Sequence, residues 1–199
     1  MRKCGNAEMQ HFPIFPFSHF PIFSFSYFHI LTLHSAMTVL GIDTSLRSTG
    51  YGVLSVEGSR MRCLTSGNIP NKATLPLTAC LKAIHAKVTD LIADFKPDVM
   101  SVESVIYGKN AGTMLVLGEA RGAVLTAAAD ADLPVYEYEP RRMKRAVCGN
   151  GLAEKEQIQR MVKTLLNLAE LPQNDAADAL GLAICHAHSN SLISTSSPI

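Results

Sequence analysis

The chain has 199 residues, of which 47% are hydrophobic and 18% are charged, a balance that suits one compact α/β domain and excludes disordered and fibrous proteins. The formal net charge of +1 shows no general excess of positive charge, so any surface that binds nucleic acid must be local. The five cysteines include no Cys-x-x-Cys pair, which argues against a disulfide framework or a zinc site and for a reducing compartment.

The first 36 residues differ in composition from the rest of the chain. Seven of the eight phenylalanines lie between residues 11 and 34, together with Pro13, Pro16 and Pro21. These prolines are incompatible with a regular transmembrane helix, and the phenylalanine spacing fits neither a strand nor a helix. Histidines and prolines also interrupt the apolar stretch that a secretory signal would need. We interpret residues 1–36 as a non-native or disordered leader and expect Met37 to be the true start.

Three strands in a meander are predicted at the beginning of the remaining chain. The apolar segments are Val39–Ile42, Gly50–Val56 and Met61–Ile69. Turn residues separate them at 44–45 and 57–59, and such short connections allow antiparallel pairing.

Helical periodicity begins at Leu75. Between Leu75 and Phe95 apolar residues recur every three or four positions, which predicts an amphipathic helix that Lys96-Pro97 ends. The segments predicted after it are strands at 98–103 and 135–139 and helices at 114–129, 152–168 and 175–188. The order β-β-β-α-β-α-β-α-α predicts a mixed sheet with helices on its faces and right-handed crossovers. The Ser/Thr-rich residues 189–199 are expected to form a flexible tail.

Four acidic residues occupy positions where a single buried charge is unfavourable. Asp43 and Glu103 each end a predicted strand, whereas Asp175 and Asp178 lie three residues apart on one face of a predicted helix. Each has a separate structural explanation: a turn bond for Asp43, a lysine partner for Glu103, or a helix cap for Asp175. Together, with no matching inward basic residues, they would repel one another by several kcal/mol in a low-dielectric cleft.

Divalent cations would remove this repulsion. Mg²⁺ prefers oxygen ligands, with Mn²⁺ as a plausible substitute, and four acids can hold two ions about 3.5–4 Å apart. One ion activates water and the other stabilises the leaving oxygen in an in-line displacement at phosphorus. The four acids therefore predict phosphodiester hydrolysis.

A series of motifs in register gives the chain a family resemblance. The motifs are Gly41-Ile-Asp43, Gly50-Tyr-Gly-Val53, Val102-Glu-Ser-Val105, Gly108-Lys-Asn110, Leu117-Gly-Glu-Ala-Arg-Gly122, Ala153-Glu-Lys155 and Asp175-Ala-Ala-Asp-Ala-Leu180. From about Thr38 to His188 the chain resembles the RuvC family of Holliday-junction resolvases. The resemblance implies a ribonuclease H-like α/β fold, with a five-stranded mixed sheet flanked by helices, as a nuclease domain at residues 37–188.

The same resemblance implies the activity and the partners. It implies a homodimeric, magnesium-dependent endonuclease that nicks a four-way DNA junction symmetrically in recombination and repair. The family's catalytic acids fall on Asp43, Glu103, Asp175 and Asp178. A cytoplasmic location, no membrane partner and the branch-migration proteins RuvA and RuvB are implied as well.

The chain departs from the family pattern at two positions. Many members have Phe three residues after the catalytic Glu, whereas this chain has Ile106 there and Tyr107 next. Because Ile cannot stack as an aromatic ring does, either Tyr107 substitutes for the Phe or base contact is weaker. Thr44 replaces the usual Pro after the first Asp and leaves the carboxylate in place.

Basic residues suggest where DNA would bind. The run Arg141–Arg145 holds four cations in five residues, and by itself a solvated surface explains it best. Beside a phosphodiester site it more plausibly binds phosphates without reading sequence. The resemblance selects Lys144 and Lys155 as DNA contacts, and Tyr107, Lys109 and Arg47 are weaker candidates. The histidines at 85, 186 and 188 are expected to be surface or core residues.

The second predicted helix is rich in glycine and alanine. Close packing on its own sheet would explain this composition. A two-fold junction that is cut twice also needs two active sites related by symmetry, which a C2 dimer supplies. The resemblance implies that this helix contributes to the dimer interface.

Two other functions compete with this interpretation. The segment Gly41–Gly50 also resembles the first phosphate loop of actin-like ATPases and sugar kinases, but we find no second phosphate loop and the chain is too short. A catalytically inactive junction-binding protein is the other alternative. Four intact acids argue against it, because binding a polyanion does not favour concentrated negative charge.

Overall fold

A computed structural model describes residues 36–104, 110–191 and 197–199. A five-stranded sheet in the order β3-β2-β1-β4-β5 forms the centre of the domain. The strands are β1 (Met37–Asp43), β2 (Ser48–Glu57), β3 (Arg60–Pro70), β4 (Val99–Glu103) and β5 (Val135–Tyr138). The first three form the predicted antiparallel meander, whereas β4 pairs parallel with both β1 and β5. The predicted mixed sheet is therefore confirmed.

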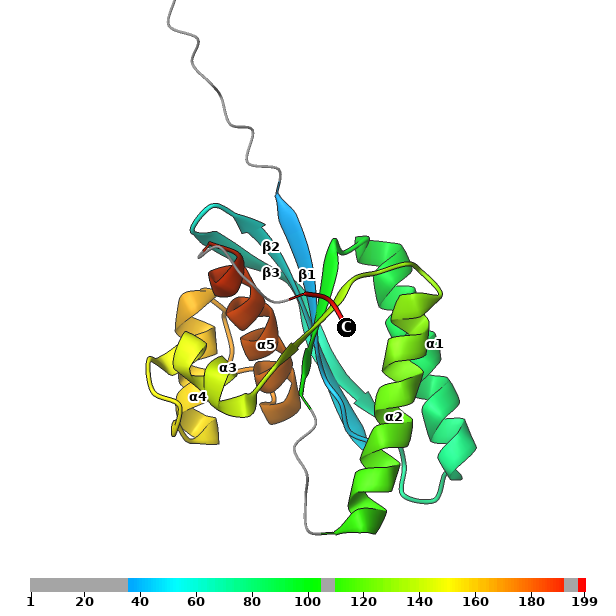
Figure 1. Ribbon diagram of the computed structural model, residues 1–199. Helices are drawn as coiled ribbons and strands as arrows, with labels where there is room; N and C mark the ends of the chain where they lie inside the picture. Colours follow the sequence, from blue (N-terminus) through cyan, green and yellow to red (C-terminus); the bar gives the residue numbers. More distant parts are fainter. Residues whose placement is uncertain (1–35, 105–109, 192–196) are drawn as a thin grey trace, which may run out of the picture. The chain divides into compact units, whose positions relative to one another are not determined.

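Helices cover both faces of this sheet (Figure 1). They are α1 (Leu77–Phe95), α2 (Ala111–Ala129), α3 (Pro140–Cys148), α4 (Lys155–Leu165) and α5 (Asn174–Ser191). In Figure 1, α1 and α2 lie on one side of the sheet and α3, α4 and α5 on the other. Within the described ranges, no helix is long and apolar enough to cross a membrane.

The two faces of the sheet bury separate hydrophobic cores. Successive side chains of a strand point to opposite faces, so neighbouring residues of β1 enter different cores. Val39 packs with residues of α3, α4 and α5, whereas Leu40 and Ile42 pack with residues of α1 and α2. By the same alternation, Asp43 belongs to the face of Val39, which is the face that α5 covers.

Helix α3 is absent from the predicted element order, which is therefore wrong at this point. We interpreted Arg141–Arg145 only as a basic run, but the run is the body of a helix. The sequence carried the signals for it. Pro140 occupies the first turn, Gly149 ends the helix with a φ of 73°, and Met143 and Val147, four residues apart, are buried. The high charge of the run obscured this apolar stripe.

The remaining predictions of regular structure differ from the structure mainly at element ends. Helix α4 begins at Lys155 rather than at residue 152, and α5 continues to Ser191, three residues beyond its predicted end. The leader predicted at residues 1–36 lies outside the described residues except for Ala36, so it remains a prediction.

Helix α5 approaches the sheet closely because glycines lie beneath it. A Cβ atom on Gly41 would be 2.0 Å from the carbonyl oxygen of Ala179, and one on Gly50 would be 2.0 Å from that of Asp175. No side chain fits at either position without moving the helix. The glycines of the GID and GYG motifs thus allow α5 to lie directly on β1 and β2.

Candidate active site

Asp43 and Glu103 end neighbouring parallel strands. Ile42 pairs with Val102, so the next residue on each strand is one of the two acids. Adjacent strands are about 4.8 Å apart, which makes the two carboxylates lateral neighbours at one end of the sheet. Val99 packs against the core on the α5 side, and Glu103, four residues further along β4, shares that face. Both acids therefore emerge at the same end of the sheet.

The other two acids reach this end from the first turns of α5. Asp43 pairs with Gly50 in the antiparallel register, and the main chain of Asp175 lies directly over Gly50. Asp178 is one helical turn further along α5. Four acids from three separate segments therefore lie at one end of the sheet.

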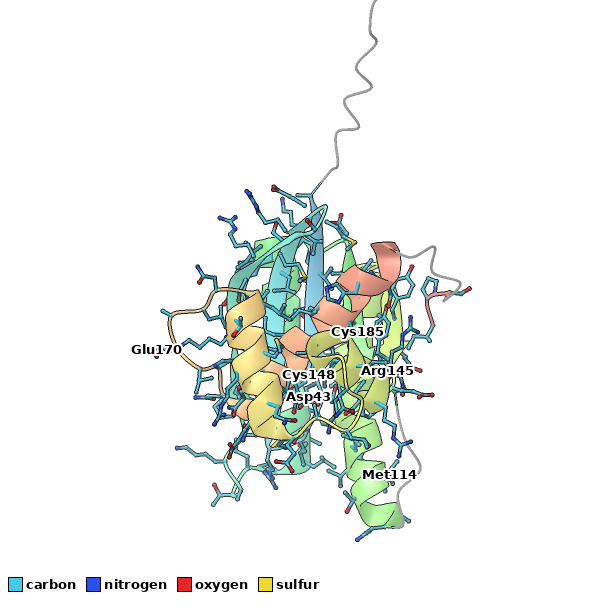
Figure 2. All side chains as sticks on the ribbon, turned by 90° about the vertical axis from the view of Figure 1, so that its left-hand side faces the viewer. Asp43, Met114, Arg145, Cys148, Glu170 and Cys185 are labelled. Carbon is cyan, nitrogen blue, oxygen red and sulfur yellow. The ribbon has the colours of Figure 1, made fainter. Side chains whose placement is uncertain are left out.

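Three of the acids line a single cavity of about 350 Å³: Asp43, Glu103 and Asp178. Figure 2, viewed from the side of α3, α4 and α5, labels Asp43 at the end of β1. Asp175 does not line this cavity. Its Oδ2 atom accepts hydrogen bonds from the Ser48 hydroxyl and, at 3.0 Å, from the Asn68 amide.

The environment raises the pKa values of the three acids that line the cavity. Burial is the main cause for Asp43, followed by the charges of Asp178, Glu103 and Asp175, and its pKa rises to about 7. Burial is also the main reason that the pKa values of Glu103 and Asp178 lie above their ordinary range, and a neighbouring Asp raises each further. The site therefore holds more negative charge than its surroundings compensate.

Two lysines line the same cavity, contrary to our expectation that no basic residue faces the acids. Lys144 of α3 and Lys155 of α4 both lower the pKa values of Glu103 and Asp178, and Lys155 also lowers that of Asp43. The Lys144 ammonium donates a hydrogen bond to the Ala153 carbonyl at 2.9 Å, which ties α3 to the loop before α4. The lysines compensate the carboxylates only in part.

The buried Arg121 of α2 supports Glu103 from the opposite face of the sheet. Its guanidinium donates to the Glu103 carbonyl at 2.6 Å and pairs with the carboxylate of Glu137 on β5. Both contacts fix the end of β4. Arg121 lies within one of the family motifs, but no local pattern connects it with Glu103.

The donor set fits a hard divalent cation. Within the described part of the chain, no three His, Cys, Asp or Glu side chains are already gathered as a metal cluster. Oxygen ligands around an under-compensated, solvent-accessible cavity are the ligands that Mg²⁺ prefers.

Among the described residues, the weaker DNA-contact candidate Arg47 does not line this cavity. The Arg47 guanidinium donates to the carbonyl of Lys72 at 2.8 Å and to that of Leu75 at 3.5 Å, so it braces the loop before α1. Tyr107 and Lys109, like Ile106, lie outside the described residues. Of the histidines, His186 is buried and bonds the Tyr138 hydroxyl at 2.8 Å, whereas His85 pairs with Asp130 at the surface.

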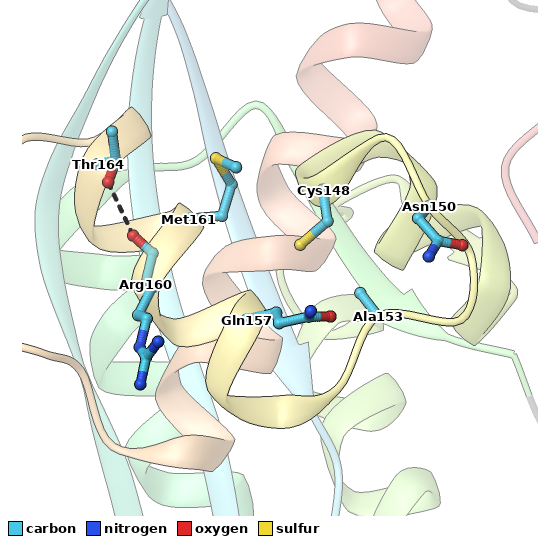
Figure 3. Close-up of a pocket in the computed structure, with 7 residues that line it drawn as sticks. All are labelled: Cys148, Asn150, Ala153, Gln157, Arg160, Met161 and Thr164. Carbon is cyan, nitrogen blue, oxygen red and sulfur yellow. Dashed lines mark hydrogen bonds between the residues drawn. The ribbon is translucent and has the colours of Figure 1, made fainter.

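A second cavity of about 470 Å³ lies between the end of α3 and α4 (Figure 3). Its walls include Cys148, Gln157, Arg160 and Met161, and none of the four acids. Figure 3 shows the Thr164 hydroxyl bonded to the Arg160 carbonyl at 2.9 Å, a contact within α4. Of these two cavities, the one that Asp43 lines has the groups suited to phosphodiester chemistry.

The model of one protein family, described as crossover junction endodeoxyribonuclease RuvC, matches residues 39–186 of the chain. The chain belongs to the RuvC family. The RuvC endonuclease of Idiomarina loihiensis is 50% identical over 156 residues, which cover 76% of this chain and 88% of the relative. That of Vibrio parahaemolyticus is 51% identical over 152 residues and covers 76% of this chain and 87% of its own.

Solved RuvC structures have the same fold. The Thermus thermophilus RuvC structure is 35% identical, with a TM-score of 0.73, and the match covers 82% of this chain and all of that one. The same protein in complex with Holliday junction substrate gives a TM-score of 0.74 at 33% identity over equal shares of the chains. The yeast mitochondrial Holliday junction resolvase Ydc2, 15% identical with a TM-score of 0.54, shares the fold. The predicted ribonuclease H-like class is confirmed.

Proposed function

We propose that this RuvC-family chain is an endonuclease that resolves four-way DNA junctions by paired, symmetrical nicking in recombination and repair. The observation that carries the proposal is the shared cavity of Asp43, Glu103 and Asp178, which also contains Lys144 and Lys155. RuvC nucleases depend in general on divalent metal ions. A relative bound to its junction substrate, similar over 82% of this chain, supports the same substrate class.

The four acids would hold the metal. We propose that Asp43, Glu103 and Asp178, joined by Asp175, bind two Mg²⁺ ions, with Mn²⁺ as a substitute. When bound, such ions supply a nucleophilic hydroxide and stabilise the leaving oxygen. The acids would contribute to metal binding by placing negative charge in one cavity. The helices α3, α4 and α5, which line that cavity, would limit the amount of water in it.

Lys144 and Lys155 are proposed to bind backbone phosphates beside the scissile bond. Both reach the cavity from α3 and α4, and two cations beside the acids would attract a polyanion that the carboxylates alone would repel. Arg47, Tyr107 and Lys109 remain proposals, and the contacts of Arg47 favour a structural role for it.

The active form is proposed to be a homodimer, because two symmetrical cuts need two sites. The outer face of α2 is a suitable interface: Leu115 is 65% exposed, and Gly118 and Gly122 present no side chain. We also propose that residues 37–188 form the nuclease domain, to which the last turn of α5 as far as Ser191 also belongs, and that residues 1–36 lie outside it. The protein is proposed to work with RuvA and RuvB in the cytoplasm.

A gel assay on a synthetic four-way junction tests the proposal. The Met37–Ile199 protein with Mg²⁺ is expected to cut two opposite strands at symmetrical positions. Asp43→Asn is expected to abolish cutting and to keep junction binding in a mobility-shift assay. A wild-type protein that binds the junction and leaves it uncut with Mg²⁺ and with Mn²⁺ would make the inactive binding protein the better description. ATP hydrolysis without DNA cutting would favour the actin-like ATPase.

A further inference from the structure

Two polar residues, one on β2 and one on the edge strand β3, hold the carboxylate of Asp175. Ser48 opens β2, and Asn68 lies on β3, where it pairs with Gly50. The Ser48 hydroxyl and the Asn68 amide both donate to Oδ2 of Asp175, and the Asn68 amide also donates to the Ser48 hydroxyl at 2.9 Å. The three side chains form a closed hydrogen-bonded ring, which we call the Ser48–Asn68 clamp.

The clamp acts where Asp175 needs a restraint. Asp175 stands in the first turn of α5, and its charge raises the pKa values of both Asp43 and Asp178. The repulsion is mutual, so an unrestrained Asp175 side chain would turn away from the other acids. Two donors directed at one oxygen oppose that movement.

The clamp also decides which oxygen stays available. Both donors use Oδ2, and no hydrogen bond among the described residues engages Oδ1. Asp175 can therefore keep its position with one oxygen and offer the other to a cation. Ligating carboxylates are commonly fixed in this way by partners that do not touch the metal.

We propose that Ser48 and Asn68 are positioning residues of the nuclease, which set the affinity of the acidic cluster for its divalent cation by holding Asp175 beside it. This inference rests on the proposed function. It assigns roles to two residues that the family motifs leave without one and that reach the site only through Asp175.

Metal binding without DNA is the direct test. Titration of Mn²⁺, followed by electron paramagnetic resonance or calorimetry, is expected to show about tenfold weaker binding for Ser48→Ala and for Asn68→Ala. Ser48→Thr keeps the hydroxyl and is expected to bind Mn²⁺ as the wild type does. Ser66→Ala is the matched control, because Ser66 lines the same side of the sheet as Asn68 without bonding Asp175.

Junction cleavage gives a second readout. The Mg²⁺ concentration for half-maximal rate is expected to rise about tenfold in both alanine variants, while the rate at saturating Mg²⁺ and the junction Kd change less than threefold. In an Asp175→Asn background, Ser48→Ala is expected to have no further effect on metal affinity, because the clamp acts through Asp175.

Three outcomes would overturn the inference: unchanged Mn²⁺ affinity in both alanine variants, an equal loss in Ser66→Ala, or additive losses in the Asp175→Asn background. Each of these would leave the clamp as an anchor of α5 only. They differ from failure of the proposed function, in which the wild type itself would neither bind Mn²⁺ nor cut the junction.

Discussion

The guanidinium of Arg121 donates a hydrogen bond to the main-chain carbonyl of Glu103 at 2.6 Å. Arg121 comes from α2, on the face of the sheet opposite the acidic cavity. The carboxylate of Glu137 on β5 accepts a hydrogen bond from a second guanidinium nitrogen of Arg121. Arg121 thus holds the main chain at the end of β4 from one face of the sheet, while Glu103 lines the cavity on the other face. The two faces of the sheet are mechanically linked at Glu103.

Arg121→Met should therefore affect both stability and cleavage. The substitution leaves the Glu137 carboxylate, with 34% of its side chain exposed, without its partner, so we expect about 2–3 kcal/mol of destabilisation. Urea unfolding measures this loss, and the junction assay should show slower cutting. Arg160→Met is the control, because Arg160 and Glu156 are exposed and 3.6 Å apart. Its cost should stay below about 0.5 kcal/mol. Equal costs would show that the Arg121 contacts contribute little.

Asp43 should make the metal-free protein less stable as the pH rises. Its folded-state pKa of about 7 lies above the ordinary value of 3.8, so between these pH values the folded state binds more protons than the unfolded state. The contribution of Asp43 to the free energy of unfolding is therefore fully present below about pH 3.8 and is lost as the pH rises towards 7.

Asp43→Asn removes this loss. In EDTA at pH 8 the variant should be more stable than the wild type by about 4 kcal/mol at most, and the difference should shrink towards pH 4. Thermal unfolding across this pH range measures it. Added Mg²⁺ should stabilise the wild type more than the variant. A constant difference at every pH would contradict the assigned cause.

Lys155→Ala should weaken junction binding through the loss of a phosphate contact. The slope of log affinity against log salt should fall by roughly 0.9 for each contact removed, for every junction sequence. Lys144→Ala should do the same and lower stability too, because it removes the bond to Ala153. Fluorescence anisotropy at several salt concentrations provides the slopes. Lys82→Ala, on exposed α1, should leave the slope unchanged. An unchanged slope for Lys155→Ala would remove this residue from the DNA surface.

Gly50→Ala should displace the start of α5. The new methyl group would lie 2.0 Å from the carbonyl oxygen of Asp175, and backbone cannot yield as a flexible side chain can. We expect a loss of about 3 kcal/mol in unfolding free energy and, because both helix acids move, at least a hundredfold slower cutting. Gly112→Ala, whose nearest neighbour is 3.4 Å away, should be close to neutral in both assays. Normal activity of Gly50→Ala would mean that α5 does not need this close approach.

The amino-acid sequence alone was sufficient for the fold class, and it singled out the four acids as candidate metal ligands. Period-two and period-3.6 patterns identify strands and helices because burial on one face repeats with the geometry of the element. Acids at the ends of apolar runs are visible in the sequence because their burial is unfavourable. Helix α3 could have been found from Pro140 and Gly149, but four cations in five residues hid its apolar stripe.

Only the tertiary structure decided which groups surround those acids. Lys144 and Lys155 face the cavity because α3 and α4 pack on α5, and Arg121 reaches Glu103 because α2 covers the opposite face. Ser48 and Asn68 meet Asp175 through the pairing of β2 with β3 beneath the helix. Such contacts join residues up to 127 positions apart, and no local pattern encodes them. The contacts of Ser48 and Asn68 with Asp175 also depend on how closely the glycines of the sheet allow α5 to approach.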